Sequence, residues 1–396
     1  LVLAGFYSKL GNLQKVGLQG IEIPSGRVLW EKTLASGQTV EDQILALSQD
    51  NEKAIIAKIK AENEPRNTSR KQTIQAEVLY VQTGQREFTL ETSGDTGQLS
   101  PKFTKDGKNI IAINGNNAYV WNIETKKVLT SFDHGDQIDS FDVDSLAEKI
   151  VTVSKSKAVI WSISSNQKIV EISLPECEVI SFGISLNKIF SSRFSANGRY
   201  IGIGGYYFTD RSQKFDPSNP AKFVINKVLW DAQTGQPIPI DVSEKYTLPN
   251  DRRLARQNAK VLFDPQGKKV LINATMIMGG GFYTRNFIWD LEKHEVVFDI
   301  LPEIESNGEF SPDGKYLAIT SSDNYKDAHY DFDREKVVGF LINLEERKII
   351  ELERGDDEKS NIFYACKGPL FFTQDGNYLL VMEGNVWFVY NVKTGE

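Results

Sequence analysis

The sequence has few of the residues on which metal and redox sites depend. It contains two cysteines, Cys177 and Cys366, in no Cys-x-x-Cys spacing, and three histidines among 396 residues. The positions of the two cysteines therefore indicate neither a zinc site nor a disulfide framework, although the two could still form a disulfide in the folded chain. The histidines, His134, His294 and His329, fall in separate segments, and we interpret each as a surface residue rather than a ligand. We therefore predict no metal and no cofactor.

An excess of positive charge and long apolar runs are also missing. The 46 Lys and Arg residues stand against 53 Asp and Glu, which gives a formal net charge of -7. No broad positive field would hold a phosphate backbone, which argues against nucleic acid as a partner. No apolar run approaches the roughly 18 to 20 residues of a membrane span, and residues 1–7 lack the flanking signals of a signal peptide. These absences favour a cytoplasmic location, with an exported or periplasmic one as the alternative.

One hairpin phrase occurs five times in the sequence. Its clearest copy reads Phe-Ser-Pro-Asp-Gly-Lys-Tyr-Leu-Ala-Ile, and the copies begin at Phe103, Phe194, Phe263, Phe310 and Phe372. An Asp-Gly or Asn-Gly pair supplies the positive φ angles that a tight turn requires, and the apolar residues on either side predict strands.

A second phrase follows each hairpin. It reads Val-Trp-Asn-Ile at its first full copy, and its copies centre on Trp121, Trp161, Trp230, Trp289, Ile342 and Tyr390. Each copy predicts a strand, a polar turn and another strand. Four short strands per unit, repeated at intervals of about 40 to 70 residues, are typical of a β-propeller blade.

These phrases resemble the WD-repeat family. Trp230-Asp231 and Trp289-Asp290 match the Trp-Asp ending of its repeats, whereas Trp121-Asn122 and Trp161-Ser162 are degenerate variants. The Phe-Ser-Pro-Asp-Gly-Lys wording is also similar to the repeats of bacterial TolB-like propellers, which implies a bacterial origin. The sequence lacks the family's regular Gly-His pair, and His134-Gly135 is at best a reversed trace of it. We therefore do not expect the family's buried Asp-His-Ser/Thr-Trp network.

We predict an all-β chain that forms a single β-propeller domain over residues 1–396. Its units of four-stranded blades span about 1–34, 44–91, 101–132, 138–174, 190–242, 259–301, 308–353 and 370–396. The pattern contains a second and a third strand in all eight units, but a first strand and a fourth strand in only seven. Eight blades, with ring closure incomplete in this fragment, are favoured, and seven blades are the alternative.

Five long insertions interrupt the repeats, at 62–73, 205–226, 243–259, 276–286 and 322–336. All are predicted to be loops that join the second to the third strand of a blade, or the fourth strand to the next blade, and so to lie on one face. Aromatic and Arg residues, the types enriched at interface hot spots, are common in them. The candidate binding residues are Tyr206, Tyr207, Phe208, Arg211, Arg252, Arg253, Arg256, Phe282, Tyr283, Arg285, Tyr325, His329 and Tyr330. Packing of the insertions onto the propeller is the alternative role of each residue.

Signals of catalysis are scarce. The sequence contains no Gly-x-Ser-x-Gly motif, and 278–281 lacks the Lys-Ser/Thr ending of a phosphate-binding loop. The acidic residues of 323–333 lack the spacing of a calcium loop, and the glycosylation patterns at Asn67 and Asn273 are interpreted as accidental. We predict a non-catalytic scaffold that binds a protein or peptide through the inserted loops, as a sensing part of a larger assembly. The alternative is a propeller enzyme, or a propeller that binds a small ligand or metal at its central channel.

Overall fold

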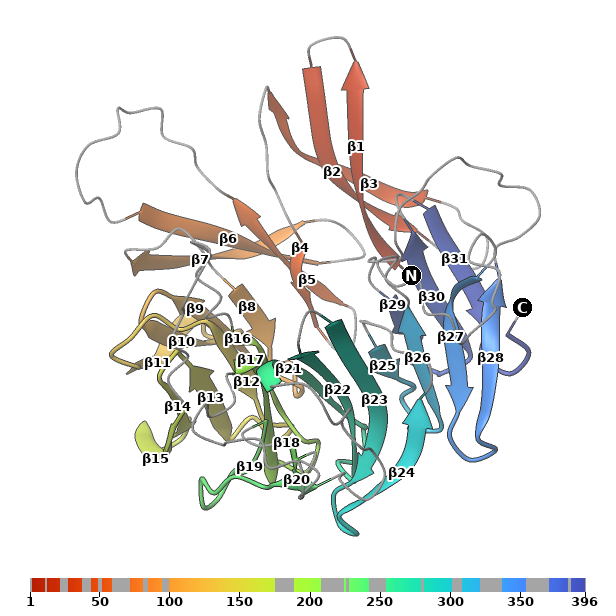
Figure 1. Ribbon diagram of the computed structural model, residues 1–396. Coiled ribbons are helices and arrows are strands. Elements are labelled where there is room, and N and C mark those ends of the chain that lie inside the picture. Colours follow the sequence, from red (N-terminus) through yellow and green to blue (C-terminus); the bar gives the residue numbers. More distant parts are fainter. Residues whose placement is uncertain are drawn as a thin grey trace, which may run out of the picture. The chain divides into compact units, whose positions relative to one another are not determined.

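The computed structural model of the protein describes residues 2–10, 13–21, 28–37, 44–48, 52–58, 72–80, 85–94, 100–174, 189–207, 224–225, 228–241, 254–278, 281–300, 308–320, 337–353, 370–383 and 386–395. The chain forms two compact units, which we describe separately. The first comprises 1–154 and 159–169, and the second comprises 155–158 and 170–396. Within the described residues the structure consists of strands and turns, without any helix (Figure 1).

The first four sheets each take consecutive strands of the chain. The first sheet contains β1 (Val2–Leu10), β2 (Leu13–Ile21) and β3 (Val28–Gly37). The second contains β4 (Ile44–Leu47), β5 (Lys53–Lys58), β6 (Gln72–Tyr80) and β7 (Arg86–Gly94). The third contains β8 (Ser100–Phe103), β9 (Asn109–Asn114), β10 (Asn117–Asn122) and β11 (Lys127–Asp133). The fourth contains β12 (Ser140–Val143), β13 (Lys149–Val153), β14 (Lys157–Ser162) and β15 (Gln167–Ser173).

The second unit holds a larger sheet and three smaller ones. The large sheet contains β16 (Ile189–Phe194), β17 (Tyr200–Tyr207), β19 (Leu229–Asp231), β21 (Leu254–Phe263), β22 (Lys269–Met278), β23 (Gly281–Asp290) and β24 (Glu295–Ile300). A two-stranded sheet pairs β18 (Val224–Ile225) with β20 (Ile240–Asp241). The last two sheets contain β25 (Gly308–Phe310), β26 (Tyr316–Thr320), β27 (Val337–Asn343) and β28 (Lys348–Glu353), and then β29 (Leu370–Phe372), β30 (Tyr378–Glu383) and β31 (Val386–Asn391).

The recurring element is a four-stranded antiparallel sheet whose strands pair in the order of the chain. This meander is the blade of a β-propeller. The prediction of an all-β chain made of four-stranded blades is therefore confirmed. The number of blades, the single domain and the closed ring stay predictions.

The turn between the first and second strands is encoded by the recurrent hairpin phrase. Around Gly314, the Ser311 hydroxyl donates to Asp313 Oδ1 at 2.6 Å and accepts the Tyr316 amide at 2.9 Å. The Lys315 amide donates to the same carboxylate at 3.0 Å. Gly314 has φ of +68°, a conformation that glycine adopts without steric penalty. The same arrangement recurs at the turns that begin with Thr104, Ser195 and Thr373.

The electrostatics of this turn favour an ionised Asp313. Partial burial raises the pKa of its carboxyl, but hydrogen bonds from Ser311 and from the Lys315 amide, together with the charge of Lys315, outweigh that effect and hold the pKa below its usual value. Hydrogen bonds to the charged form stabilise it.

The residue that follows the Trp of the second phrase caps the turn between the third and fourth strands. Asp231 Oδ1 accepts the amides of Gln233 and Thr234 at 2.9 and 2.8 Å, and these bonds help to hold the pKa of Asp231 low against its partial burial. Asp290 accepts two amides of the next turn in the same way. The Trp-Asp pair is therefore a strand residue followed by a turn cap.

Apolar side chains fill the space between successive sheets within each unit. In the second unit one cluster joins Leu271, Ile288 and Ile300 of β22–β24 to residues of β25–β27, which are Phe310, Leu317, Ile319, Phe340 and Ile342. In the first unit a cluster of the same kind joins Ile111, Val120 and Phe132 to Phe141 and Ile150 of the next sheet. Phe310, which opens one copy of the hairpin phrase, thus packs between two sheets.

Candidate functional site

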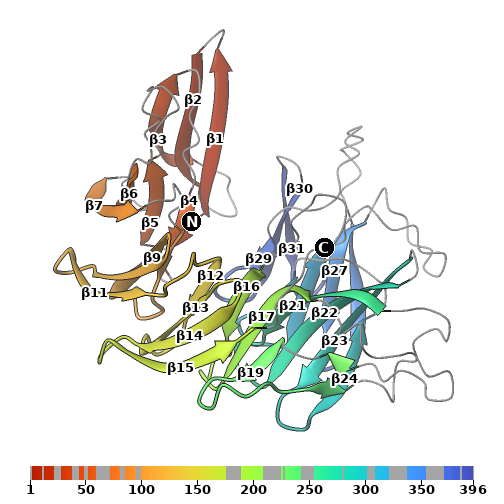
Figure 2. The ribbon, with the colours of Figure 1, turned by 60° about the vertical axis from the view of Figure 1, so that its left-hand side comes forward.

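The most prominent departure from a simple blade is an extension shared by β17, β21, β22 and β23, which lie side by side in the second unit (Figure 2). At one end, β17 pairs with β19 of its own predicted blade. At its other end it pairs with β21 instead, with Gly205 opposite Ala259 and Tyr207 opposite Gln257. Two predicted blades are therefore joined in one sheet.

Close packing of β17 on β21 depends on a residue without a side chain. A Cβ added at Gly202 would lie 3.0 Å from Cβ of Val261 and 3.2 Å from the Phe263 ring. This is tighter than ordinary van der Waals contact, so the glycine permits the close approach of the two strands.

Three of the predicted loops are corrected by this extension. Residues 276–286 were expected to form a loop, but β22 continues to Met278 and β23 begins at Gly281, which leaves only Gly279 and Gly280 between the paired strands. Of the predicted loop at 243–259, residues 254–259 belong to β21, and of that at 205–226, residues 205–207 belong to β17. β-branched and aromatic residues in these segments favour strands, and cross-strand pairing is available to them.

The register of the extension sets predicted binding residues in rows. Tyr207 is opposite Gln257, Gln257 is opposite Met276, and Met276 is opposite Tyr283. One row is thus shared by four strands, with a tyrosine at each end. A neighbouring row aligns Arg256, Ile277 and Phe282. We call residues 205–207, 256–259, 274–277 and 282–285 the four-strand extension.

Six of the predicted binding residues lie in the four-strand extension. They are Tyr206, Tyr207, Arg256, Phe282, Tyr283 and Arg285. The other seven, Phe208, Arg211, Arg252, Arg253, Tyr325, His329 and Tyr330, lie outside the described residues. The register therefore brings together residues from three of the five predicted insertions.

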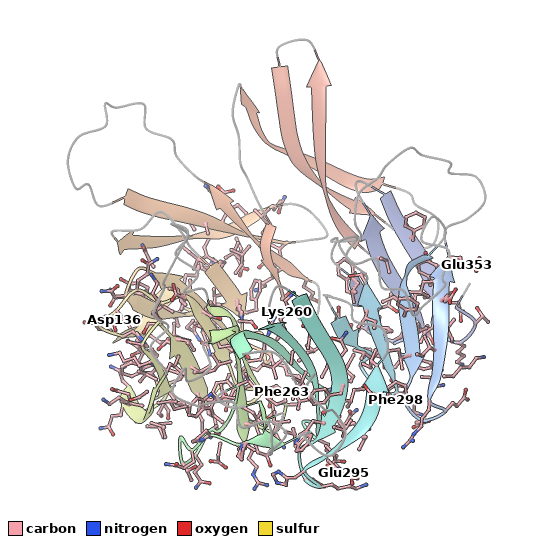
Figure 3. All side chains as sticks on the ribbon, in the orientation of Figure 1. Asp136, Lys260, Phe263, Glu295, Phe298 and Glu353 are labelled. Atoms are coloured by element: carbon pink, nitrogen blue, oxygen red, sulfur yellow. The ribbon has the colours of Figure 1, made fainter. Side chains whose placement is uncertain are left out.

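The base of the four-strand extension is a buried amide pair. Asn273 Nδ2 donates to Asn286 Oδ1 at 2.6 Å, and the two residues are only 4% and 2% exposed. Lys260, labelled on β21 in Figure 3, is opposite Asn273 in the register. Burial of Asn273 agrees with our interpretation that its glycosylation pattern is accidental. A satisfied polar pair above an apolar core gives the extension a rigid base.

Charged residues that the sequence analysis missed occupy one position of three first strands, directly before the Phe that ends each of these strands. In the first unit, Lys102 Nζ is 2.9 Å from Asp142 Oδ1 and donates to the Phe141 carbonyl oxygen at 2.8 Å. Aligning the hairpin phrases on their Phe residues would have revealed this position. It carries Lys102, Arg193 and Glu309 in three copies.

Glu309 on β25 is the acidic residue at this position, and the pKa of its carboxyl is raised. Burial raises the pKa of its carboxyl to about 7, although the positive charge of Arg193 on β16 works in the opposite direction. Desolvation disfavours the charged form of a carboxyl, and the charge of Arg193 is insufficient to offset it. Glu309 therefore changes its charge near neutral pH.

His134 is buried, which corrects its interpretation as a surface residue. It is 2% exposed, and its Nδ1 lies 2.8 Å from Thr152 Oγ1. Trp161 Nε1 donates to the same hydroxyl oxygen at 2.8 Å. A His-Thr-Trp network is thus present in the first unit, where none was expected. The three residues are present in the sequence, but the family's pair has the order Gly-His. The reversed order His134-Gly135 hid the correspondence with the family's network.

The described residues offer no cluster of three or more His, Cys, Asp or Glu that could hold a metal ion. Among the same residues no helix is long and apolar enough to cross a membrane.

Comparisons with known proteins give similarities in structure alone. No protein-family model and no curated protein sequence matches the chain. Among solved structures, the β-propeller domain of Cps50 (Swd1) from Myceliophteria thermophila is similar, with a TM-score of 0.44 and 11% identity over 75% of this chain and 83% of that one. Hydrazine synthase from Kuenenia stuttgartiensis is also similar, with a TM-score of 0.43 and 16% identity over 71% of this chain and 72% of that one. These values bear on neither ligand nor activity.

Proposed function

We propose that the protein is a non-catalytic recognition module that binds a protein or peptide partner at the four-strand extension. The observation that supports this most directly is the row Tyr207, Gln257, Met276 and Tyr283, set by backbone pairing across four strands. Tyrosine combines a large apolar surface with a polar end and is enriched at interface hot spots.

A sheet is a better platform for recognition than a set of loops. Backbone pairing fixes the spacing between residues on neighbouring strands, so less conformational entropy is lost when a partner binds. Arg285 adds a positive charge on the face of this row, because it lies two residues from Tyr283 on β23. We infer that the partner presents an apolar side chain and a carboxylate, because Arg binds carboxylates through two parallel hydrogen bonds.

Site-specific photocrosslinking tests the proposal and identifies the face that binds. Adjacent residues of a strand lie on opposite faces of a sheet, so p-benzoylphenylalanine in place of Phe282 or of Tyr283 samples the two faces of β23 separately. We expect the position of Tyr283, which lies in the proposed row, to capture a discrete partner from cell extract, and the position of Phe282 on the opposite face to capture none. The same replacement at Tyr378, which is 39% exposed on β30, is the control and is expected to capture none.

The captured partner, once produced pure, allows a quantitative test. Tyr283→Ala combined with Arg285→Ala is expected to weaken binding by about a hundredfold, which corresponds to the loss of two hot-spot side chains. Tyr378→Ala is expected to leave the Kd within a factor of about two. Equal crosslinking at Tyr283 and Tyr378, or an unchanged Kd in the double variant, would refute the proposal.

The charged first strands support a second candidate, which is binding of a small charged ligand. Arg193 and Glu309 place opposite charges on β16 and β25 of the second unit, and Glu309 is largely buried. Perturbed acids of this kind cluster at functional sites. A thermal-shift screen of small charged metabolites would favour this candidate if a compound raised the Tm of the wild type but not of Arg193→Met.

A further inference from the structure

Two hairpin turns of the second unit are each joined to the next hairpin turn by a side-chain amide. Asn197, in the turn after β16, donates from Nδ2 to the Gly267 carbonyl oxygen at 3.0 Å. Gln266, in the turn after β21, donates from Nε2 to the Asp313 carbonyl oxygen at 2.8 Å. The turns that follow β16, β21 and β25 are therefore linked in series by two hydrogen bonds.

The first of these links depends on a close approach of the two turns. A Cβ added at Gly267 would lie 2.9 Å from the backbone nitrogen of Asn197 and 3.0 Å from its Cγ, so a larger residue would push the turns apart. Phe263, labelled in Figure 3, ends β21 directly before this turn. β17 and β21 are thus held together at both ends, by the pairing of Gly205 with Ala259 in the four-strand extension and by the Asn197 link at the opposite end.

The two linking amides differ in chemical reactivity. Both Asn197 and Gln266 precede a glycine, whose lack of a side chain leaves its backbone nitrogen open to approach. In an Asn-Gly pair this nitrogen attacks the side-chain amide carbon and closes a five-membered imide ring. A Gln-Gly pair has to close a six-membered ring, which is much slower. The Asn197 link is therefore chemically labile, whereas the Gln266 link is durable.

We propose that Asn197 is a site of spontaneous deamidation, and that its conversion to aspartate breaks the link to Gly267 while its own turn stays intact. The Gly198 nitrogen loses its proton and forms a bond to Asn197 Cγ, the Cγ–Nδ2 bond breaks, and ammonia leaves. Water then adds to the imide and opens it to aspartate or isoaspartate. Water is the only other reactant, and no group is oxidised or reduced. This modification site is separate from the residues proposed to bind a partner.

Burial distinguishes Asn197 from a second Asn-Gly pair of the described residues. The sequence contains three such pairs, of which the pair at 307–308 begins outside the described residues. Asn114, at the end of β9, is 1% exposed, whereas Asn197 is an exposed turn residue. The Gly198 amide donates to the Ser195 carbonyl oxygen at 2.8 Å, so the attack requires a brief opening of the turn. Such an opening costs less at an exposed turn than at a buried strand end.

Another copy of the hairpin phrase shows that aspartate is compatible with the turn. Asp313 occupies the matching position, and its carboxylate accepts the hydroxyl and the amide of its own turn at 2.6 and 3.0 Å. Asn197 Oδ1 accepts the Ser195 hydroxyl at 2.7 Å and the Arg199 amide at 3.1 Å. An aspartate at this position keeps both bonds, but it has no N–H to donate to Gly267, and its carboxylate repels the carbonyl oxygen. Deamidation therefore lets β17 and β21 separate at the turn end while they stay paired in the four-strand extension.

Peptide mapping by mass spectrometry measures the reaction. The chain of residues 1–396 is incubated at mildly alkaline pH, once folded and once unfolded in urea. In the folded chain we expect aspartate and isoaspartate to accumulate at Asn197, while Asn114 and Gln266 stay unchanged. In urea both asparagines are expected to react at similar rates, because both precede glycine. The proposal is overturned if Asn197 stays intact in the folded chain while it reacts in urea, or if Asn114 reacts as fast as Asn197 in the folded chain.

Asn197→Asp reproduces the product and tests its structural consequence. Hydrogen exchange measured by mass spectrometry is expected to become about fivefold faster in 264–269, because one hydrogen bond that restrains this turn is lost, and to stay unchanged in 195–200. Gln266→Glu is the matched control. It breaks only the second link, so exchange is expected to accelerate in 311–316 and to keep the wild-type rate in 264–269. Wild-type exchange in 264–269 of Asn197→Asp overturns the proposal.

Discussion

Replacement of Glu309 by glutamine tests whether a buried carboxyl makes stability depend on pH. Burial raises the pKa of Glu309 from 4.5 to about 7, against the opposing charge of Arg193. Between these two values the folded state retains a proton that the unfolded state has lost. The folded state therefore binds more protons, and the free energy of unfolding falls as the pH rises.

The magnitude follows from the same two values. Each pH unit between them corresponds to about 1.36 kcal/mol, so the wild type is expected to lose about 3 kcal/mol of stability between pH 4.5 and pH 7 through this one group. The full contribution is present below pH 4.5 and is lost above pH 7. Glu309→Gln keeps the shape of the side chain but cannot ionise, and should abolish this loss.

Urea unfolding followed by tryptophan fluorescence, at a series of pH values from about 4 to 8, measures the effect. Subtracting the wild-type free energy of unfolding from that of Glu309→Gln removes the titration of all other groups. We expect this difference to be close to zero at about pH 4 and to reach about 3 kcal/mol in favour of the variant at pH 8. Glu351→Gln, on the exposed side of β28, is the control and should give a flat difference. A flat difference for Glu309→Gln as well would refute the reasoning.

Three further substitutions test the internal structure of the sheets, each by its effect on the free energy of unfolding. Thr152→Val should lower it by about 1 to 3 kcal/mol, because the Trp161 indole and the His134 ring lose their shared hydroxyl, whereas Thr152→Ser should preserve most of it. His294→Gly should raise it by about 1 kcal/mol, because His294 has φ of +57°, and an unchanged value would show that this turn is not strained. Gly339→Ala should lower it by about 1 to 3 kcal/mol, because the added Cβ would lie 2.7 Å from a backbone oxygen of β26, and tolerance of alanine would mean that the strands can separate there.

The features that the sequence predicted correctly are those encoded within a few residues. The turn at Gly314 depends on Ser311 and Asp313, which lie in the same short phrase. The cap of the next turn type depends on Asp231, two or three residues from the amides that it accepts. Local hydrogen bonds of this kind can be inferred from spacing, and the strands that flank them follow from alternation of apolar residues.

The features that the sequence did not predict depend on pairing between distant segments. Nothing near Tyr207 indicates that it lies opposite Gln257 rather than in a loop. The burial of Glu309 likewise results from packing of whole strands, so its raised pKa has no local signal. The aromatic and Arg residues of the insertions were recognised as unusual, but their placement in strands required the register.

The tryptophans illustrate why a repeated residue can have different roles in different blades. Trp161 donates to Thr152, the third residue after Lys149, which closes its hairpin turn. The third residues after the corresponding Tyr200 and Lys269 are Ile203 and Ile272, both 0% exposed. In those two blades the indole nitrogens of Trp230 and Trp289 are buried and have no hydrogen-bond partner among the described residues. Trp121, Trp161 and Trp289 therefore pack in apolar clusters, while a residue on a different strand decides whether such a tryptophan also joins a hydrogen-bond network.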